Sequence, residues 1–195
     1  SERDQLIRNM AKLFSYVSDR CEDEQVVQYD EALCLLAELV EVEARAHVAK
    51  ILAPLQRAPG TVVVKLANDE IEVARPLLEF SNVLSDDDLI DIIEKKSEDH
   101  RMAIAGRASV TERVGEAIVE HGDSGTVIKL VRNTNAEIGR TTLEKLVQRA
   151  SQDAAIAEDL RNRAEIDWRS LRGEIDSVAD RSEEHTSELQ SRRDL

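Results

Sequence analysis

The sequence predicts an all-α protein, in which an N-terminal helical bundle is followed by a stack of short helix pairs. Aromatic residues make up only 3% of the 195 residues, and with 7 glycines and 3 prolines the chain is poorly suited to a β-sandwich or barrel. Hydrophobic residues reach 42%, which is enough for a packed core. They recur at spacings of three and four along most of the chain, as they do on one face of a helix.

Residues 1–56 are predicted to form the N-terminal bundle, with helices over 2–19, 22–42 and 43–53. Pro54 follows the third helix, where a proline stops helix growth. In the first helix the expected core face consists of Leu6, Ile7, Met10, Leu13, Phe14 and Val17.

Residues 57–166 are predicted to form repeats of shorter helices. The valine-rich run at 61–66 could be a strand by residue type, but its neighbours are helical in pattern, so we predict a helix. Ser85 with Asp88 forms a capping box at the start of one helix, and Thr141 with Glu144 forms another. The second box falls inside a predicted helix and so allows a break there. The further helices are expected at 70–80, 86–95, 99–107, 112–121, 125–132, 136–150 and 152–162.

An internal repeat supports this arrangement. Residues 72–79, EVARPLLE, and residues 137–144, EIGRTTLE, share four identities at a spacing of 65, and AIAGR at 103–107 lies about midway. The unit is therefore predicted to be about half of that spacing, which is one helix pair. Such pairs bury too little surface alone and form a continuous core when they stack.

Three arginines occupy corresponding positions of these units, and an Asp or Asn precedes each at a similar offset. One hypothesis is a row of cations for an acidic ligand. We prefer a structural ladder, in which each arginine bonds a turn side chain or carbonyl group of its own or the next repeat. The predicted ladder consists of Asp69, Arg75, Asp99, Arg107, Asn133 and Arg140.

The segment LANDEIEVARPLL, residues 66–78, resembles the turn and helix of a HEAT repeat, which implies a HEAT-like α-solenoid. The chain also resembles an uncharacterised alphaproteobacterial family, domain of unknown function 2336, over most of residues 1–166. The resemblance implies this fold and a cytoplasmic setting, and it implies no activity. The matching stretches are EARAHVAKILAPLQRAP (43–59), VKLANDEIEVARPLLEFSNVLSDDDL (64–89), AIAGRASV (103–110), VEHGD (119–123) and LRNRAEI (160–166).

Beyond the repeats, residues 167–180 are predicted to be a helix fragment and residues 181–195 a disordered tail. Residues 181–191, RSEEHTSELQS, resemble the translation of a widely used sequencing adapter, so we expect this tail to be foreign to the natural protein. Trp168 is expected either to cap the end of the stack or to anchor a partner or a further C-terminal part, since exposed tryptophans are enriched in binding hot spots.

Charge narrows the range of partners. The chain has 26 basic and 40 acidic residues and a net charge of −14, which argues against binding nucleic acid or an anionic membrane. A protein partner with a basic segment fits better, and its binding should weaken with salt. No apolar run approaches the ~20 residues of a membrane span. With only two cysteines, Cys21 and Cys34, a reducing compartment is expected, consistent with the cytoplasm.

The sequence predicts no catalytic, metal or cofactor residues. His47, His100 and His121 have no metal-binding spacing, and His121 is expected to end a helix. Cys34 lies among leucines and is expected to be buried, whereas Cys21 is expected to be exposed. We therefore predict a non-enzymatic interaction or scaffold module. The alternatives are a regulatory domain of a signalling protein and a HEAT-like enzyme that acts on nucleic acid, although the latter needs a basic groove.

Overall fold

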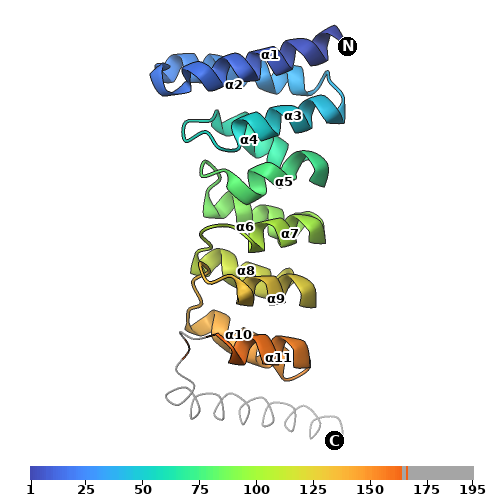
Figure 1. Cartoon of the computed structure of the whole chain (residues 1–195), viewed down its shortest axis with the longest axis vertical. Helices are drawn as coiled ribbons and strands as arrows, with labels where there is room; N and C mark the ends of the chain where they lie inside the picture. Colours follow the sequence, from blue (N-terminus) through green and yellow to red (C-terminus); the bar gives the residue numbers. More distant parts are fainter. Residues whose placement is uncertain (164–165, 167–195) are drawn as a thin grey trace, which may run out of the picture.

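A computed structural model describes residues 1–163 and 166 (Figure 1). Within these residues all regular secondary structure is helical, which confirms the predicted all-α class. A short 3-10 helix, η1 (Ser18–Arg20), extends the first α-helix. The α-helices are α1 (Glu2–Val17), α2 (Asp23–Ala37), α3 (Val42–Leu52), α4 (Gly60–Ala67), α5 (Ile71–Phe80), α6 (Asp86–Lys95), α7 (Glu98–Ala105), α8 (Glu112–His121), α9 (Ser124–Arg132), α10 (Arg140–Ala150) and α11 (Ala154–Arg161).

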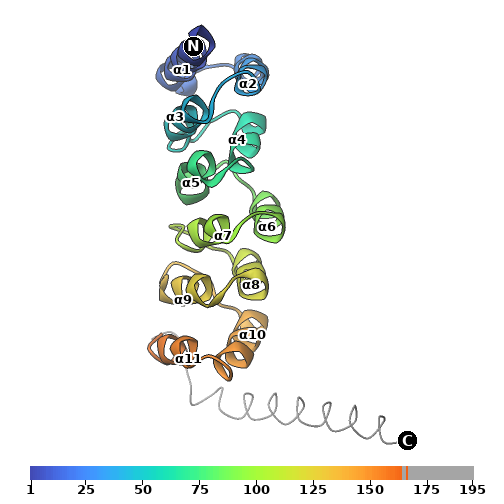
Figure 2. The same cartoon turned by 90° about the vertical axis from the view of Figure 1, so that its right-hand side faces the viewer.

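The helices stack in two columns, odd-numbered and even-numbered, as Figure 2 shows. Each odd-numbered helix packs on the next odd-numbered one from α1 to α11, and α6, α8 and α10 pack on each other in the same way. The boundary that the sequence suggested after residue 56 falls between α3 and α4. Helices on both sides of this boundary are in contact, α3 with α5 and α2 with α4.

One apolar core runs the length of this stack. Each helix buries small and branched residues between the columns, and the buried side chains form a single cluster from Ile7 in α1 to Leu160 in α11. In α8, for example, Val114 and Ile118 are four residues apart and both are buried. Because each pair covers the core of its neighbour, short helices can be stable here. Among the described helices, none has both the length and the apolar character needed to cross a membrane.

Side-chain caps determine where several helices begin. Ser85 and Asp88 form the predicted capping box at the start of α6, and the predicted bounds of α6 and α8 are confirmed. The helix predicted over 136–150 begins only at Arg140, after Gly139. Residues 136–139 instead run beside the loop before α8, where Glu137 donates its backbone N–H to the carbonyl oxygen of Val110 over 2.8 Å. A break in the predicted helix is therefore present, but it falls before Arg140. The predicted Thr141–Glu144 capping box does not form, because Gly139 is the N-cap and Thr141 lies within α10.

The structural repeat is shorter than the length that the sequence suggested, which was about half of 65 residues. Helices α6, α8 and α10 begin at Asp86, Glu112 and Arg140, which are 26 and 28 residues apart. The 65-residue match joined α5, in one column, to α10, in the other, so it paired positions with different surroundings.

Two details of burial also differ from prediction. Leu6 and Leu13 of α1 were expected to face the core, but both are about half exposed, because only the other side of α1 packs on α3. The two cysteines exchange their expected environments. Cys21 is buried after η1, and Cys34 is partly exposed on α2.

We predict that Ile118→Ala lowers the free energy of unfolding by about 3 kcal/mol, because it leaves a cavity in the continuous core. Urea unfolding followed by circular dichroism would measure the loss. Phe80→Ala is the control, since Phe80 is 64% exposed, and it should cost less than about 1 kcal/mol. Equal losses for the two variants would contradict the packing described above.

Candidate functional site

The last carbonyl groups of a helix have no hydrogen-bond partner within that helix. In the odd-numbered column of this protein, a side chain that follows the next odd-numbered helix donates hydrogen bonds to several of them. Arg107, just beyond α7, donates to the carbonyl oxygens of Leu78 and Ser81 at the end of α5, over 2.6 and 2.7 Å. Its side chain is buried, at 7% exposure. Burial lowers the pKa of Arg107, while the carboxylate of Asp86 acts to raise it. The negative end of the α5 dipole helps to stabilise this buried cation.

The same type of bond recurs along the odd-numbered column. Asn133, after α9, donates through Nδ2 to the carbonyl oxygens of Ala105 and Arg107, over 3.0 and 2.8 Å. Arg163, after α11, is also buried and donates to several carbonyl oxygens at the end of α9 and beyond, including that of Ala136 at 2.5 Å.

Arg57 does the same for the first helix, because it donates to the carbonyl oxygens of Ser18 and Cys21 after α1, over 3.0 and 2.7 Å. These bonds join odd-numbered helices at their carboxyl ends. We call the set the carboxyl-end ladder: Arg57, Arg107, Asn133 and Arg163.

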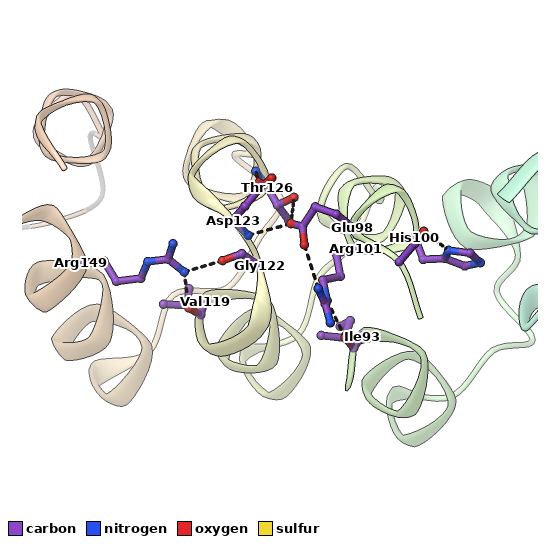
Figure 3. Close-up of polar contacts among 10 residues, drawn as sticks. Ile93, Glu98, His100, Arg101, Val119, Gly122, Asp123, Thr126 and Arg149 are labelled. Atoms are coloured by element: carbon purple, nitrogen blue, oxygen red, sulfur yellow. Dashed lines mark hydrogen bonds and ion pairs between the residues drawn. The ribbon is translucent and has the colours of Figure 1, made fainter. Parts of the chain in front are cut away.

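The opposite ends of the odd-numbered helices are joined as well (Figure 3). Glu98, in the first turn of α7, accepts hydrogen bonds from the Thr126 hydroxyl at 2.5 Å and the Asp123 backbone N–H at 2.7 Å, at the start of α9. Arg101 also donates to Glu98, over 2.9 Å. Burial acts to raise the pKa of the Glu98 carboxyl, but the hydrogen bonds from Thr126, Asp123 and Arg101 outweigh it and lower the pKa.

Asp69, in the turn before α5, links three helices. Its carboxylate pairs with Arg45 of α3 over 2.6 Å, and its carbonyl oxygen lies 2.8 Å from Nε2 of the buried His100 in α7. Since a carbonyl oxygen only accepts, Nε2 carries the proton, and Nδ1 of His100 accepts from the Ser97 hydroxyl at 2.7 Å.

The start of α9 is joined to α11 in the same manner, since Ser124 donates to Asp153. These bonds connect α3, α5, α7, α9 and α11 at their amino ends. We call the set the amino-end ladder: Arg45, Asp69, Glu98, His100, Asp123, Ser124, Thr126 and Asp153.

The even-numbered column has its own contacts of this kind (Figure 3). Arg149 of α10 donates to the carbonyl oxygens of Val119 and Gly122 at the end of α8, over 3.0 and 2.6 Å. Glycine suits position 122, because a Cβ atom there would lie 2.7 Å from the carbonyl oxygen of Ile118. In both columns, therefore, side-chain hydrogen bonds to the ends of helices join one helix to the next.

The structure brings together only part of the ladder predicted from sequence. Asp69, Arg107 and Asn133 do belong to the ladders, although their partners lie in neighbouring helices, mostly on the backbone. Within the described residues, Arg75 and Asp99 are exposed and bond to no other helix. Arg140 is an exposed residue of the first turn of α10 and contacts Glu144 of the same helix over 3.3 Å. For Arg75 and Arg140 the difference follows from the 65-residue alignment, which paired a residue in the middle of α5 with one at the start of α10.

Sequence reasoning missed several ladder residues, although a signal for them exists. A polar residue begins the odd-numbered helices every 26–30 residues, as at Ser97, Asp123 and Asp153. An Arg or Asn follows α7, α9 and α11 by one or two residues. A search at that period, starting from helix caps, would have found Asp123 and Asp153 of the amino-end ladder and Arg107, Asn133 and Arg163 of the carboxyl-end ladder.

Trp168, the helix fragment at 167–180 and the tail at 181–195 lie outside the described residues, so the predictions about them stay predictions. In the part of the chain that the structure describes, the acidic, histidine and cysteine side chains form no group of three or more that could hold a metal ion.

A shallow acidic cleft lies on the even-numbered column between α6 and α8, with a volume of about 210 Å³. Ile90 and Ala117 supply apolar surface, and Lys145 of α10 donates to Glu116 and Glu120 at 2.9 and 3.2 Å. We call it the α6–α8 cleft, and its lining residues are Ile90, Glu94, Arg113, Glu116, Ala117, Glu120 and His121.

Comparison with known proteins gives one match. The family model described as "uncharacterised protein conserved in bacteria" (DUF2336) matches residues 73–192, from α5 to beyond the described residues. The matched range includes the adapter-like stretch 181–191. No curated protein and no solved structure matches the chain.

We predict that Arg107→Ala destabilises the protein by about 3 kcal/mol, because it leaves the carbonyl groups at the end of α5 unpaired in a buried position. The matched control is Arg75→Ala, an exposed arginine of the same stack, which should cost less than about 0.5 kcal/mol. Chemical denaturation of both variants measures the difference. If the two losses were alike, the carboxyl-end ladder would have no structural importance.

A second prediction concerns pH. Because the pKa of Glu98 is lowered in the folded protein, its carboxylate adds stability above the unfolded-state pKa of about 4.3, and this stability is lost as pH falls through the lower folded-state pKa. Glu98→Gln should therefore be less stable than wild type at neutral pH, and the difference should shrink below about pH 4. Thermal unfolding at a series of pH values tests this. A difference independent of pH would show that the charge of Glu98 contributes nothing.

Proposed function

We propose that this chain, which belongs to that family of uncharacterised proteins conserved in bacteria, is a HEAT-like α-solenoid that binds another protein and does not itself catalyse a reaction. Stacked helix pairs around one continuous core support the solenoid assignment. Such a stack offers a long surface on which a partner segment can lie.

The ladders support a structural use for the side chains that could otherwise do chemistry. His100 is buried with both ring nitrogens bonded, Glu98 accepts three hydrogen bonds, and Arg107 is bonded to backbone carbonyl groups. Each is therefore engaged in joining helices. This arrangement favours a binding role for the exposed surface.

The observation that carries the proposal is the α6–α8 cleft. It combines three carboxylates, those of Glu94, Glu116 and Glu120, with apolar surface from Ile90 and Ala117. The carboxylates outnumber the two cations at the cleft, which are Arg113 and the Lys145 that pairs with Glu116 and Glu120. A basic segment with interspersed apolar residues is complementary to this surface in both charge and hydrophobicity.

The use of arginines inside the stack adds to this charge. Arg57, Arg107, Arg149 and Arg163 direct their guanidinium groups to backbone carbonyl oxygens of other helices. Many of the acidic side chains remain at the surface. The surface that a partner meets is therefore more acidic than the composition alone suggests, which further favours a basic partner.

A cytoplasmic setting is part of the proposal. Cys21 and Cys34 are unpaired cysteines, which suits a reducing compartment.

Binding of a labelled peptide by fluorescence anisotropy tests the proposal. The probe is a helical peptide in which helical turns rich in Lys and Arg alternate with turns rich in Leu. The comparison peptide has Glu in place of each basic residue. The basic peptide should bind, and its dissociation constant should rise at least about tenfold between about 50 and 500 mM NaCl. The triple variant Glu94→Gln/Glu116→Gln/Glu120→Gln should bind at least about tenfold more weakly than wild type.

The control carries the same change of charge on the other column: Glu43→Gln/Glu72→Gln/Asp99→Asn, three exposed residues of α3, α5 and α7. It should bind the basic peptide as wild type does. Equal weakening by both triple variants would show attraction to overall charge and no site, and an absence of binding would contradict the proposed basic partner.

A further inference from the structure

Exposed apolar side chains are concentrated at one end of the stack. Among the described residues, seven large hydrophobic side chains are at least half exposed, and six of them lie within residues 6–39, on α1, α2 and the turn that follows. These two helices form the end of the stack at the top of Figure 1. Such a surface on a stacked-repeat protein is costly in water unless something covers it. The six are Leu6, Leu13, Tyr16, Val27, Leu35 and Leu39.

On α1 these side chains belong to a regular seam. The exposed residues follow one another at steps of four, three, four, three and four, which is the heptad spacing of a coiled coil. The seam continues through η1 and faces away from the side of α1 that packs on α3. We call it the α1 seam: Glu2, Leu6, Asn9, Leu13, Tyr16 and Arg20.

The α1 seam is complementary to itself. When two copies lie antiparallel, a single register places Leu6 opposite Tyr16 of the second copy and Asn9 opposite Leu13 of the second copy. The same register places Glu2 opposite Arg20 of the second copy. Because the pairing is two-fold symmetric, each contact occurs twice, and an acidic residue meets a basic one at both ends.

Charge also favours a second copy at this place. Residues 1–20 contain four basic and three acidic side chains, whereas the whole chain has a net charge of −14. Two strongly acidic molecules repel each other over most of their surfaces. The α1 seam lies in a segment with no net negative charge and adds apolar contact, so this segment adds no like-charge repulsion of its own, whereas residues 21–39 beside it hold six acidic and no basic side chains.

A cleft beside the seam gives room for the second helix. It lies between α1 and α2, has a volume of about 700 Å³, and is lined partly by Met10, Val17, Tyr29 and Ala32. Met10 and Val17 directly follow the seam residues Asn9 and Tyr16, so the cleft borders the seam, and Arg20 belongs to both. Arg20, Gln25 and Gln28 also line the cleft, so it offers mixed apolar and polar surface next to the seam and widens the surface that a second copy can bury.

We propose that two copies of this chain associate through this end, with α1 packed antiparallel against α1 of the second copy along the α1 seam. The dimer would be a pair of stacks joined at their N-terminal ends, with both α6–α8 clefts outside the interface. The proposal does not depend on what, if anything, binds those clefts.

Sedimentation velocity of the full chain across a concentration series tests the proposal. Wild type should form a concentration-dependent dimer. Leu13→Glu should raise the dimer dissociation constant at least about tenfold, because each of the two copies then places a negative charge at the centre of the interface. Phe80→Glu is the matched control, since Phe80 is the exposed large hydrophobic residue on α5, and it should leave dimerisation unchanged. Circular dichroism confirms that both variants are folded.

A charge exchange tests the register. Glu2→Arg and Arg20→Glu should each weaken the dimer, because each places like charges opposite one another twice. The double variant Glu2→Arg/Arg20→Glu should restore dimerisation to within about threefold of wild type. A wild-type chain that stays monomeric at every concentration would overturn the proposal. So would a dimer that Leu13→Glu leaves intact, or a double variant weaker than both single ones.

Discussion

Short helices leave most of their backbone polar groups at their ends, and the described structure depends on how those groups are bonded. From α4 onward the helices have 8–11 residues, while the first four N–H groups and last four carbonyl groups of any helix lack partners within it. The carboxyl-end and amino-end ladders supply many of those partners from neighbouring helices. Apolar burial makes the stack compact, and the ladders determine which helix end meets which.

This division of roles explains the surface of the protein. Arginines that bind carbonyl groups inside the stack, such as Arg107 and Arg163, contribute little positive charge outside it. The even-numbered column then presents carboxylates around the α6–α8 cleft, whereas α1 presents an apolar seam in a segment without net negative charge. The two surfaces differ in chemistry and lie at separate places on the stack, so the two proposed interactions do not overlap.

Signals within a single helix predicted where the helices lie. Contacts between different helices were harder to predict from the sequence. The box of Ser85 and Asp88 marks the start of α6 because a cap acts within one turn. The ladders depend on which residues of different helices become neighbours. The 65-residue match joined α5 to the start of α10, and these segments lie in different columns of the stack. Leu6 and Leu13 were assigned to the core because periodicity shows that a face is apolar and does not show what covers it.

The central claim is that side chains beyond one helix stabilise the end of the previous helix in its column. Native-state hydrogen exchange on Arg107→Ala tests it most directly, because it reports on each helix separately. The account predicts that amides of both α5 and α7 lose protection relative to wild type, while those of α1 and α2 keep theirs. Loss of protection confined to α7, with α5 unchanged, would contradict the account.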